Sequence, residues 1–190
     1  MSILGLSKSL MYDFHYNYIK TKYGDKTKLL FTDTDSLAYE IKTKYFYKDV
    51  NPDIEKRFDT SDYQTNHPSG IKTGLNSKVL GVFKDEAGGK QIVEFVGLRA
   101  KLYSYKMING SEDKKGKGVT KNVTKRNIQF DDYREYLFSR KEQHRKMNVT
   151  RSHCHAFYTE EINKIALSSD DDKRVIMADG IQTLAYGHTN

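Results

Sequence analysis

The sequence predicts an α+β fold, with a sheet-rich body followed by a more helical and basic part. Three observations point to this class: apolar residues at helical spacing near the N-terminus, short alternating segments between turn residues, and no apolar run approaching the ~20 residues of a membrane span. The chain has 190 residues, 37% hydrophobic and 12% aromatic, enough for one domain or one domain plus a small lobe. Its 2 Pro and 13 Gly exclude a fibrous repeat.

The N-terminal part predicts a helix followed by a hairpin. Apolar residues recur at steps of three and four from Ile3 to Tyr18, and Gly24 stands where a helix C-cap glycine would lie. Two short strands, 28–31 and 36–41, flank the acidic segment 32–35. We therefore expect a hairpin that carries its acidic residues at the tip, with the strands' apolar residues anchored against the first helix.

The middle of the chain predicts strands between turns. A short helix with Pro52 near its start is expected over 45–58, and a polar loop over 59–74. Three segments bounded by turn residues are predicted to be strands. They are 78–84, 91–98 and 101–108. Turns are expected at 87–89 and at 109–110, where glycines follow small or polar residues.

The later part mixes a loop, a helix and further strands. Residues 111–118 are polar and predict a solvated loop, and Asp131 is a suitable N-cap for a helix that ends near Arg140. Strand-like patterning resumes at Met147. Strands are expected at 157–167 and 175–177, with an acidic turn at 170–172 between them. His153 and His155 flank the single cysteine, Cys154, which favours an alternating strand over a zinc site, because structural zinc needs four ligands.

Positive charge is concentrated in one segment. Residues 99–126 contain nine basic side chains and two acidic ones, which accounts for the whole net charge of +7. The basic residues are Arg99, Lys101, Lys106, Lys114, Lys115, Lys117, Lys121, Lys125 and Arg126. Such a local excess is typical of a surface that binds nucleic acid, and it is equally consistent with a solvated basic loop.

The predicted hairpin tip carries two carboxylates. In an extended segment Asp33 and Asp35 share a face, and their mutual repulsion would be relieved by a cation. Mg²⁺ prefers carboxylate oxygens together with water and substrate phosphates, so the tip suits one half of a two-metal phosphoryl-transfer site. The alternative is an ordinary turn in which the Asp and Thr side chains only bond to backbone groups.

Two motifs in this order resemble those of family B DNA polymerases. The segment Phe31-Thr32-Asp33-Thr34-Asp35-Ser36 resembles their Y-x-D-T-D-S motif, with phenylalanine in place of tyrosine. Further along, Lys101 and Tyr103 match their K-x-Y motif. The flanking segments are similar to the protein-primed branch found in viruses, linear plasmids and Maverick/Polinton transposons. The resemblance covers the whole chain.

The resemblance implies a fold and a reaction. Residues 1–128 would be the C-terminal part of a palm domain, and 129–190 a small mixed thumb. The activity would be template-directed addition of deoxynucleotides to a primer 3′-OH, with two Mg²⁺ ions. Asp35 would be a direct metal ligand and Asp33 its functionally sensitive neighbour. The DNA-binding residues would be Lys101, Tyr103, Arg99, Lys114, Lys115 and Lys117.

Other polymerase motifs are missing from these residues. The upstream palm motif D-x-x-S-L-Y-P, the finger motif K-x-x-x-N-S-x-Y-G and an exonuclease domain are not present. We therefore expect a polymerase fragment that supplies half of the metal site and is inactive alone; the alternative is a non-enzymatic DNA-binding remnant. Expected partners are primer–template DNA, a deoxynucleoside triphosphate and a terminal protein primer. The single cysteine and the lack of a targeting or membrane segment predict an intracellular protein, nuclear if transposon-derived.

Overall fold

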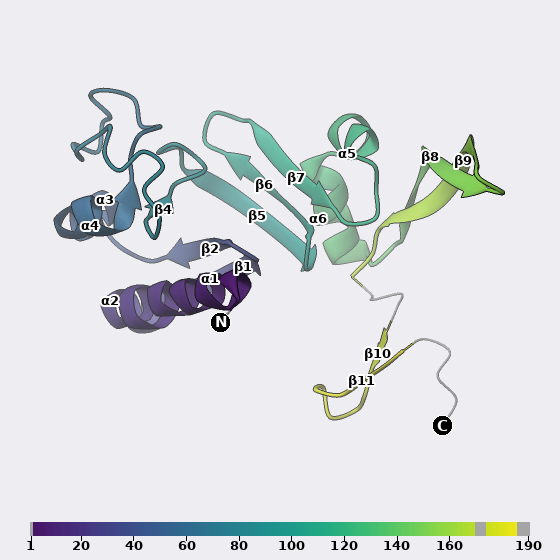
Figure 1. The fold of residues 1–190 in the computed structure, drawn as a ribbon, viewed down its shortest axis with the longest axis horizontal. Helices are drawn as coiled ribbons and strands as arrows, with labels where there is room; N and C mark the ends of the chain where they lie inside the picture. The colour runs from purple at the N-terminus through teal and green to yellow at the C-terminus, as the bar shows by residue number, and fades with distance from the viewer. Residues whose placement is uncertain (1, 170–173, 186–190) are drawn as a thin grey trace. The chain divides into compact units, whose positions relative to one another are not determined.

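The computed structural model describes residues 2–169 and 174–185, which form an α+β structure of short helices and small sheets (Figure 1). The chain divides into two compact units. Unit 1 comprises Met1–Val93 with Met107–Ser111, and unit 2 comprises Glu94–Lys106 with Glu112–Asn190. The α+β class is confirmed, whereas the palm–thumb boundary after residue 128 stays a prediction. No helix of the described part is long and apolar enough to cross a membrane.

Unit 1 begins with the predicted helix, which is longer than expected. It runs through α1 (Ile3–Tyr12), the π-helical segment η1 (Asp13–Lys20) and α2 (Thr21–Tyr23), and it ends at Gly24 with φ 53°, as the sequence predicted. Met11 of this helix is buried, and one buried cluster contains Phe14, Tyr18, Ile19 and Tyr23. Steps of four and five between them suit the wide turns of a π-helix, which closes hydrogen bonds over five residues.

The predicted hairpin is present directly after the helix. Strand β1 (Thr27–Asp33) pairs antiparallel with β2 (Ser36–Ile41), after the short 3₁₀ turn η2 (Gly24–Lys26). Leu37, Tyr39 and Ile41 pack against the buried aromatic residues of the helix, as expected. Leu29 and Phe31, which were also expected there, are not part of this cluster; for Phe31 a bulge between Leu29 and Phe31 shifts the pairing register by one residue.

The rest of unit 1 is a small layer of short elements. The helical segment contains α3 (Phe46–Val50), the 3₁₀ turn η3 (Asn51–Asp53) and α4 (Ile54–Arg57). It begins at Phe46, so Pro52 lies in the turn between two helices and not near the start. Strand β3 (Phe58–Asp59) pairs in parallel with β4 (Phe83–Lys84). A second core contains Val50, Ile54 and Ile71.

The predicted strand 78–84 is mostly wrong. Only Phe83–Lys84 is extended and paired, and the preceding residues form turns. Asn76, Lys78 and Gly81 have φ angles of 57°, 59° and 86°, which are incompatible with a regular strand. The apolar residues of this segment therefore did not decide its local conformation.

Unit 2 contains a three-stranded antiparallel arrangement in the order β5-β6-β7. Strands β5 (Ile92–Arg99) and β6 (Leu102–Met107) confirm the predictions for 91–98 and 101–108. The third strand, β7 (Glu112–Gly116), corrects the predicted loop 111–118. Its polar residues form a strand because their backbone pairs with β6, from Leu102 opposite Gly116 to Lys106 opposite Glu112.

Two helices pack on this sheet. Helix α5 (Lys121–Asn127) was not predicted, and α6 (Phe130–Ser139) confirms the helix predicted from Asp131 to near Arg140 (Figure 1). Its N-cap is Gln129, not Asp131: the Gln129 side chain and Asp132 form a reciprocal capping box. The core joins sheet and helix residues, namely Val96, Leu102, Ile128, Phe130, Tyr133, Tyr136, Ala166 and Leu167.

The last described elements are two hairpins. Strand β8 (Gln143–His153) pairs with β9 (Ala156–Leu167), and β10 (Arg174–Ile176) pairs with β11 (Thr183–Ala185). The predicted pairing of 157–167 with 175–177 is therefore wrong, and the acidic segment 170–172 lies outside the described residues. Cys154 and His155 are not in a strand. Their φ angles of 47° and 64° form a two-residue turn of type I′.

Candidate functional site

The hairpin tip is a tight turn that separates the two aspartates. The Asp35 backbone N–H donates to the Asp33 carbonyl at 2.6 Å, and Thr34 between them has φ 55°. This is the pattern of a classic γ-turn, which is rare and strained. Ser36 Oγ donates to the same carbonyl at 3.1 Å, and Thr34 Oγ1 donates to Asp33 Oδ1 at 3.3 Å. Two of these bonds hold the Asp33 backbone carbonyl, and the third holds the Asp33 side chain.

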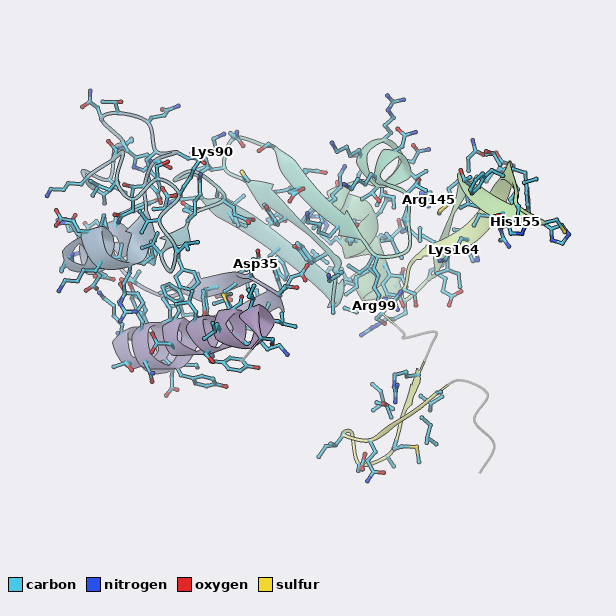
Figure 2. The ribbon with its side chains drawn as sticks, viewed as in Figure 1. Asp35, Lys90, Arg99, Arg145, His155 and Lys164 are labelled. Carbon is cyan, nitrogen blue, oxygen red and sulfur yellow. The ribbon has the colours of Figure 1, made fainter. Side chains whose placement is uncertain are left out.

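The two carboxylates have different settings. Asp33 ends β1 and is partly buried, whereas Asp35 lies in the turn and is exposed (Figure 2). Within the residues that the structure describes, no hydrogen bond or ion pair involves the Asp35 side chain. The strand alternation expected for the pair does not apply, because only Asp33 is in a strand.

The bulge in β1 decides the direction of Asp33. Leu29 lies opposite Tyr39, but beyond the bulge Asp33 lies opposite Ser36. Directly opposed residues share a face of the ribbon, and neighbours along a strand alternate. Because Leu37 and Tyr39 face the helix, Ser36 and Asp33 face away from it. Without the bulge, alternation would place Leu29 and Asp33 on the same face.

The tip can supply only part of a metal site. Its carboxylate oxygens are ligands that Mg²⁺ or Mn²⁺ accepts, and Mg²⁺ usually keeps several waters and binds few protein groups. Among the described residues, however, no group of three or more His, Cys, Asp or Glu side chains could hold a metal ion. The donors at Asp33 and Asp35 therefore fit a hard cation chemically, with further ligands required from outside the hairpin.

The residues of the K-x-Y motif are not presented together. Lys101 is exposed in the turn between β5 and β6, with φ 60°, while Tyr103 lies in β6 and is only 5% exposed. In a continuous strand, as predicted for 101–108, residues two apart would point to the same side. Because Lys101 lies in the turn, the two side chains do not share a strand face. The register places Lys115 opposite Tyr103, so Lys115 is the lysine on the same sheet face.

Lys114 has a structural role that the sequence did not indicate. Its side chain is 11% exposed, and its Nζ donates to the carbonyl oxygens of Ile128 at 2.7 Å and Lys125 at 3.5 Å. It also lies 3.8 Å from the Glu112 carboxylate. A cation near the C-terminal carbonyls of α5 stabilises that helix end. Lys114 is thus a predicted DNA-binding residue whose charge is used within the chain.

The charge of Lys106 also has partners within the chain. Its Nζ lies 4.5 Å from the centre of the Phe130 ring and 3.6 Å from the Asp131 carboxylate. Arg99 lies in β5 and is partly buried (Figure 2). Part of the positive charge in the basic segment is therefore offset by nearby groups.

The remaining basic side chains of this segment point to solvent. They are Lys115, Lys117, Lys121, Lys125 and Arg126, and no ion pair joins them to another described residue. Lys164 of β9 adds a cation next to the β7–α5 turn: a methyl group on Gly118 would lie 3.1 Å from its Nζ (Figure 2). Only the tertiary structure reveals Lys164, because it is distant in sequence. We call these six residues the exposed basic group.

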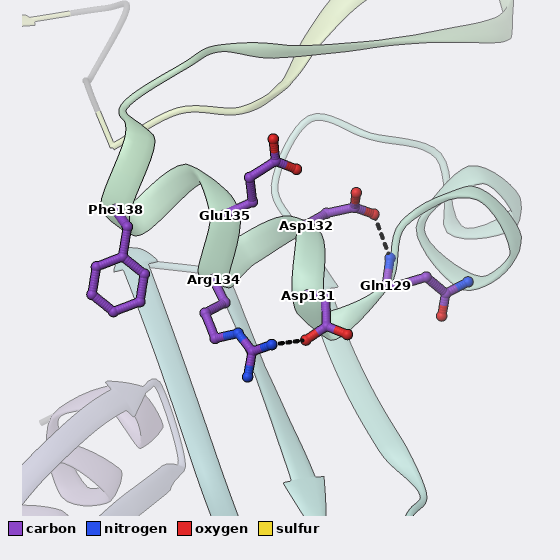
Figure 3. Close-up of a pocket in the computed structure, with 6 residues that line it drawn as sticks. All are labelled: Gln129, Asp131, Asp132, Arg134, Glu135 and Phe138. Carbon is purple, nitrogen blue, oxygen red and sulfur yellow. Dashed lines mark hydrogen bonds and ion pairs between the residues drawn. The ribbon is translucent and has the colours of Figure 1, made fainter.

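An open hollow of about 510 Å³ lies along α6 and contains none of the predicted site residues (Figure 3). Its lining residues are Gln129, Asp131, Asp132, Arg134, Glu135 and Phe138. Asp131 bonds to Arg134 at 2.9 Å, and Asp132 accepts the Gln129 backbone N–H at 2.7 Å. These carboxylates thus have structural partners, and the hollow does not resemble a metal centre.

Comparisons with known protein families, with curated proteins and with solved structures found no match to this chain.

Proposed function

We propose that this chain acts in DNA-directed DNA synthesis as part of the palm and thumb of a family B-like polymerase. The observation that carries the proposal is the hairpin of β1 and β2, which holds Asp33 at a strand end and Asp35 in the adjoining turn. The sequence around it resembles the Y-x-D-T-D-S motif, and the exposed basic group offers a surface for DNA phosphates.

Asp33 and Asp35 would hold the metal in this proposal. A bound Mg²⁺ would neutralise phosphate charge and favour attack by the primer 3′-OH. The exposed Asp35 carboxylate is accessible as a direct ligand, and Asp33, directed away from the helix, would support it. The γ-turn keeps both groups two residues apart at one tight turn, which limits the entropy lost when a cation binds.

The exposed basic group would hold the DNA backbone. Lys117, Lys121 and Lys125 are exposed around the β7–α5 turn, with Lys164 beside it. Lysine binds phosphate as a point charge without reading sequence, which suits an enzyme that must accept any template. Lys114 and Tyr103 are assigned structural roles instead, because both are largely buried.

Metal binding tests the proposal directly. Water-proton relaxation should detect Mn²⁺ binding to the chain, and Asp35→Asn should abolish it, since it removes the exposed ligand. Asp25→Asn is the matched control, because Asp25 is an exposed aspartate in the turn before β1. Equal Mn²⁺ binding by both variants would contradict the assignment of the tip.

Primer extension tests how much of the polymerase active site this chain supplies. The chain offers two carboxylates at the tip, and no group of three or more metal-ligating side chains is found among its described residues. We therefore expect no Mg²⁺-dependent extension of a primed template by the chain alone. Extension that is abolished by Asp35→Ala would show that further catalytic carboxylates are present.

A non-enzymatic DNA-binding module is the second candidate. It is favoured by the exposed basic group, which can bind phosphates without any metal ion. The two candidates differ in their response to Mn²⁺: a binding module should bind DNA equally with and without the ion and should be insensitive to Asp35→Asn.

A further inference from the structure

The π-helical segment η1 brings His15 against the helix-facing side of the hairpin. His15 Nδ1 lies 2.9 Å from the Tyr39 hydroxyl oxygen, a hydrogen bond between helix and strand. The two rings are also nearly parallel, with an interplanar angle of 8° and centres 5.8 Å apart. Tyr16 also contacts the imidazole, edge-on, at 4.6 Å between ring centres. His15 is thus held in one orientation by two aromatic neighbours and one directional bond.

Tyr39 connects this contact to the tip. It lies in β2 opposite Leu29, three residues from Ser36, which pairs with Asp33 and donates to the Asp33 carbonyl. Burial raises the pKa of the Tyr39 hydroxyl to about 12, so this group stays protonated at neutral pH and can donate to His15 Nδ1. The His15 contact therefore acts on the same strand that holds the Asp33 backbone.

An isolated two-stranded ribbon is only marginally stable, so contacts with the helix decide where its tip lies. The apolar contacts of Leu37, Tyr39 and Ile41 favour burial but are not directional. A hydrogen bond requires a particular distance and angle, and it therefore selects one position of the ribbon on the helix.

We propose that His15 is a positioning residue that sets the location of the Asp33–Asp35 turn through its bond with Tyr39. The inference rests on the proposed function, because that function assigns a bound cation to the turn. His15 contacts the opposite face of the hairpin from Asp33, because Tyr39 is on the helix-facing side and Asp33 faces away. Precise placement matters there because carboxylates bind Mg²⁺ within a narrow geometry.

Three variants separate positioning from simple packing. Tyr39→Phe keeps the ring and removes the hydroxyl. His15→Asn keeps a polar atom near the place of Nδ1, whereas His15→Gln places its amide nearer the position of Nε2 and is the matched control. Spin labels at Lys8→Cys and Thr34→Cys, both exposed sites, report the tip relative to the helix in a Cys154→Ser background.

Electron paramagnetic resonance should give a narrow label-to-label distance distribution for the parent and for His15→Asn. Tyr39→Phe and His15→Gln should broaden or shift it. In unlabelled protein, Tyr39→Phe and His15→Gln should raise the Kd for Mn²⁺ about fivefold, which corresponds to the net contribution of one hydrogen bond. His15→Asn should keep the Kd of the parent. Melting curves identify any variant that fails to fold, and the remaining variant then decides the outcome.

The results distinguish this inference from the proposed function. Identical distance distributions in all variants, with Mn²⁺ bound normally, overturn the positioning role and leave the metal assignment intact. If the parent binds no Mn²⁺, the proposed function fails, and the assignment of His15 to a cation site fails with it.

Discussion

Side chains of the same residue type differ in exposure and in bonding in this protein. Lys114 and Lys117 are close in sequence, yet the first is 11% exposed and bonded to carbonyl oxygens, while the second is exposed. Asp33 and Asp35 likewise differ, since one faces away from the helix at a strand end and the other extends from the turn. Function at this scale depends on which groups remain available to a ligand.

Asp35→Asn should leave the metal-free protein equally stable or slightly more stable, by less than about 0.5 kcal/mol, because surface changes away from special contacts have small effects. The substitution removes a negative charge near Asp33 and breaks no side-chain bond in the described structure. Thermal melts with and without Mn²⁺ check this: the ion should stabilise the parent but not the variant. A clear loss of stability without the ion would instead indicate an aspartate that serves only the turn.

Asp53 makes the stability of unit 1 depend on pH. The Lys22 ammonium donates to its carboxylate at 2.6 Å and, with the Tyr18 hydroxyl at 2.9 Å, lowers the pKa of Asp53. A carboxyl whose pKa is lower in the folded state stabilises the fold above its unfolded pKa of about 3.9, and this contribution is lost as pH falls through the folded pKa.

Asp53→Asn should therefore destabilise the protein by about 1 kcal/mol at pH 7, the order expected for a partly exposed ion pair with an added hydrogen bond. The difference from the parent should shrink as the pH is lowered below about 4, where the parent carboxylate also becomes neutral. Denaturant melts across this pH range measure both effects. A difference that stays constant with pH would show that the side-chain shape, and not its charge, is responsible.

Secondary-structure elements here depend on both local sequence and pairing partners. The first helix and the β1–β2 hairpin follow from apolar spacing and turn residues. By contrast, β7 is polar and forms because β6 offers its backbone groups. The β8–β9 hairpin is long, and its turn contains Cys154 and His155 at positive φ, a conformation that non-glycine residues adopt at a cost.

Replacing His155 by glycine should stabilise the β8–β9 hairpin by about 0.5–1 kcal/mol, because glycine adopts positive φ without a steric penalty. Ala156→Gly is the control: Ala156 begins β9 as a strand residue, so glycine there should destabilise. Melting temperature and amide exchange across the hairpin measure the two changes. A destabilising His155→Gly would show that the imidazole makes a contact that outweighs the turn geometry.

The whole molecule carries a net charge of +7, and the structure divides that charge into an internal and an external part. Lys106 and Lys114 are paired within unit 2, while the exposed basic group is accessible to solvent. Nucleic-acid binding should therefore depend on a subset of the basic segment and not on its total charge.

DNA affinity should be weak, independent of sequence and strongly reduced by salt, because each neutralised phosphate releases counterions. Combined replacement of Lys117, Lys121 and Lys125 by alanine should flatten the plot of log affinity against log salt by roughly 0.9 per lost contact with duplex DNA. Lys114→Ala is the contrast, since it should lower the melting temperature and leave the slope unchanged. Fluorescence anisotropy over a salt series measures the slopes; a salt-independent affinity would argue against phosphate binding.

The sequence alone determined the α+β class, the first helix with its Gly24 end, and the hairpin with Asp33 and Asp35 at its tip. These features depend on periodic apolar residues and turn residues, which act over a few positions along the chain. Tertiary structure decided the strand β7, the pairing of β9 with β8, the burial of Lys114 and Tyr103, and the proximity of Lys164 to Gly118. It also decided the face that Asp33 occupies, because a single bulged residue reverses the alternation. All of these features have the same physical reason. Backbone pairing and burial depend on groups far away in sequence, and a local sequence pattern contains no information about those groups.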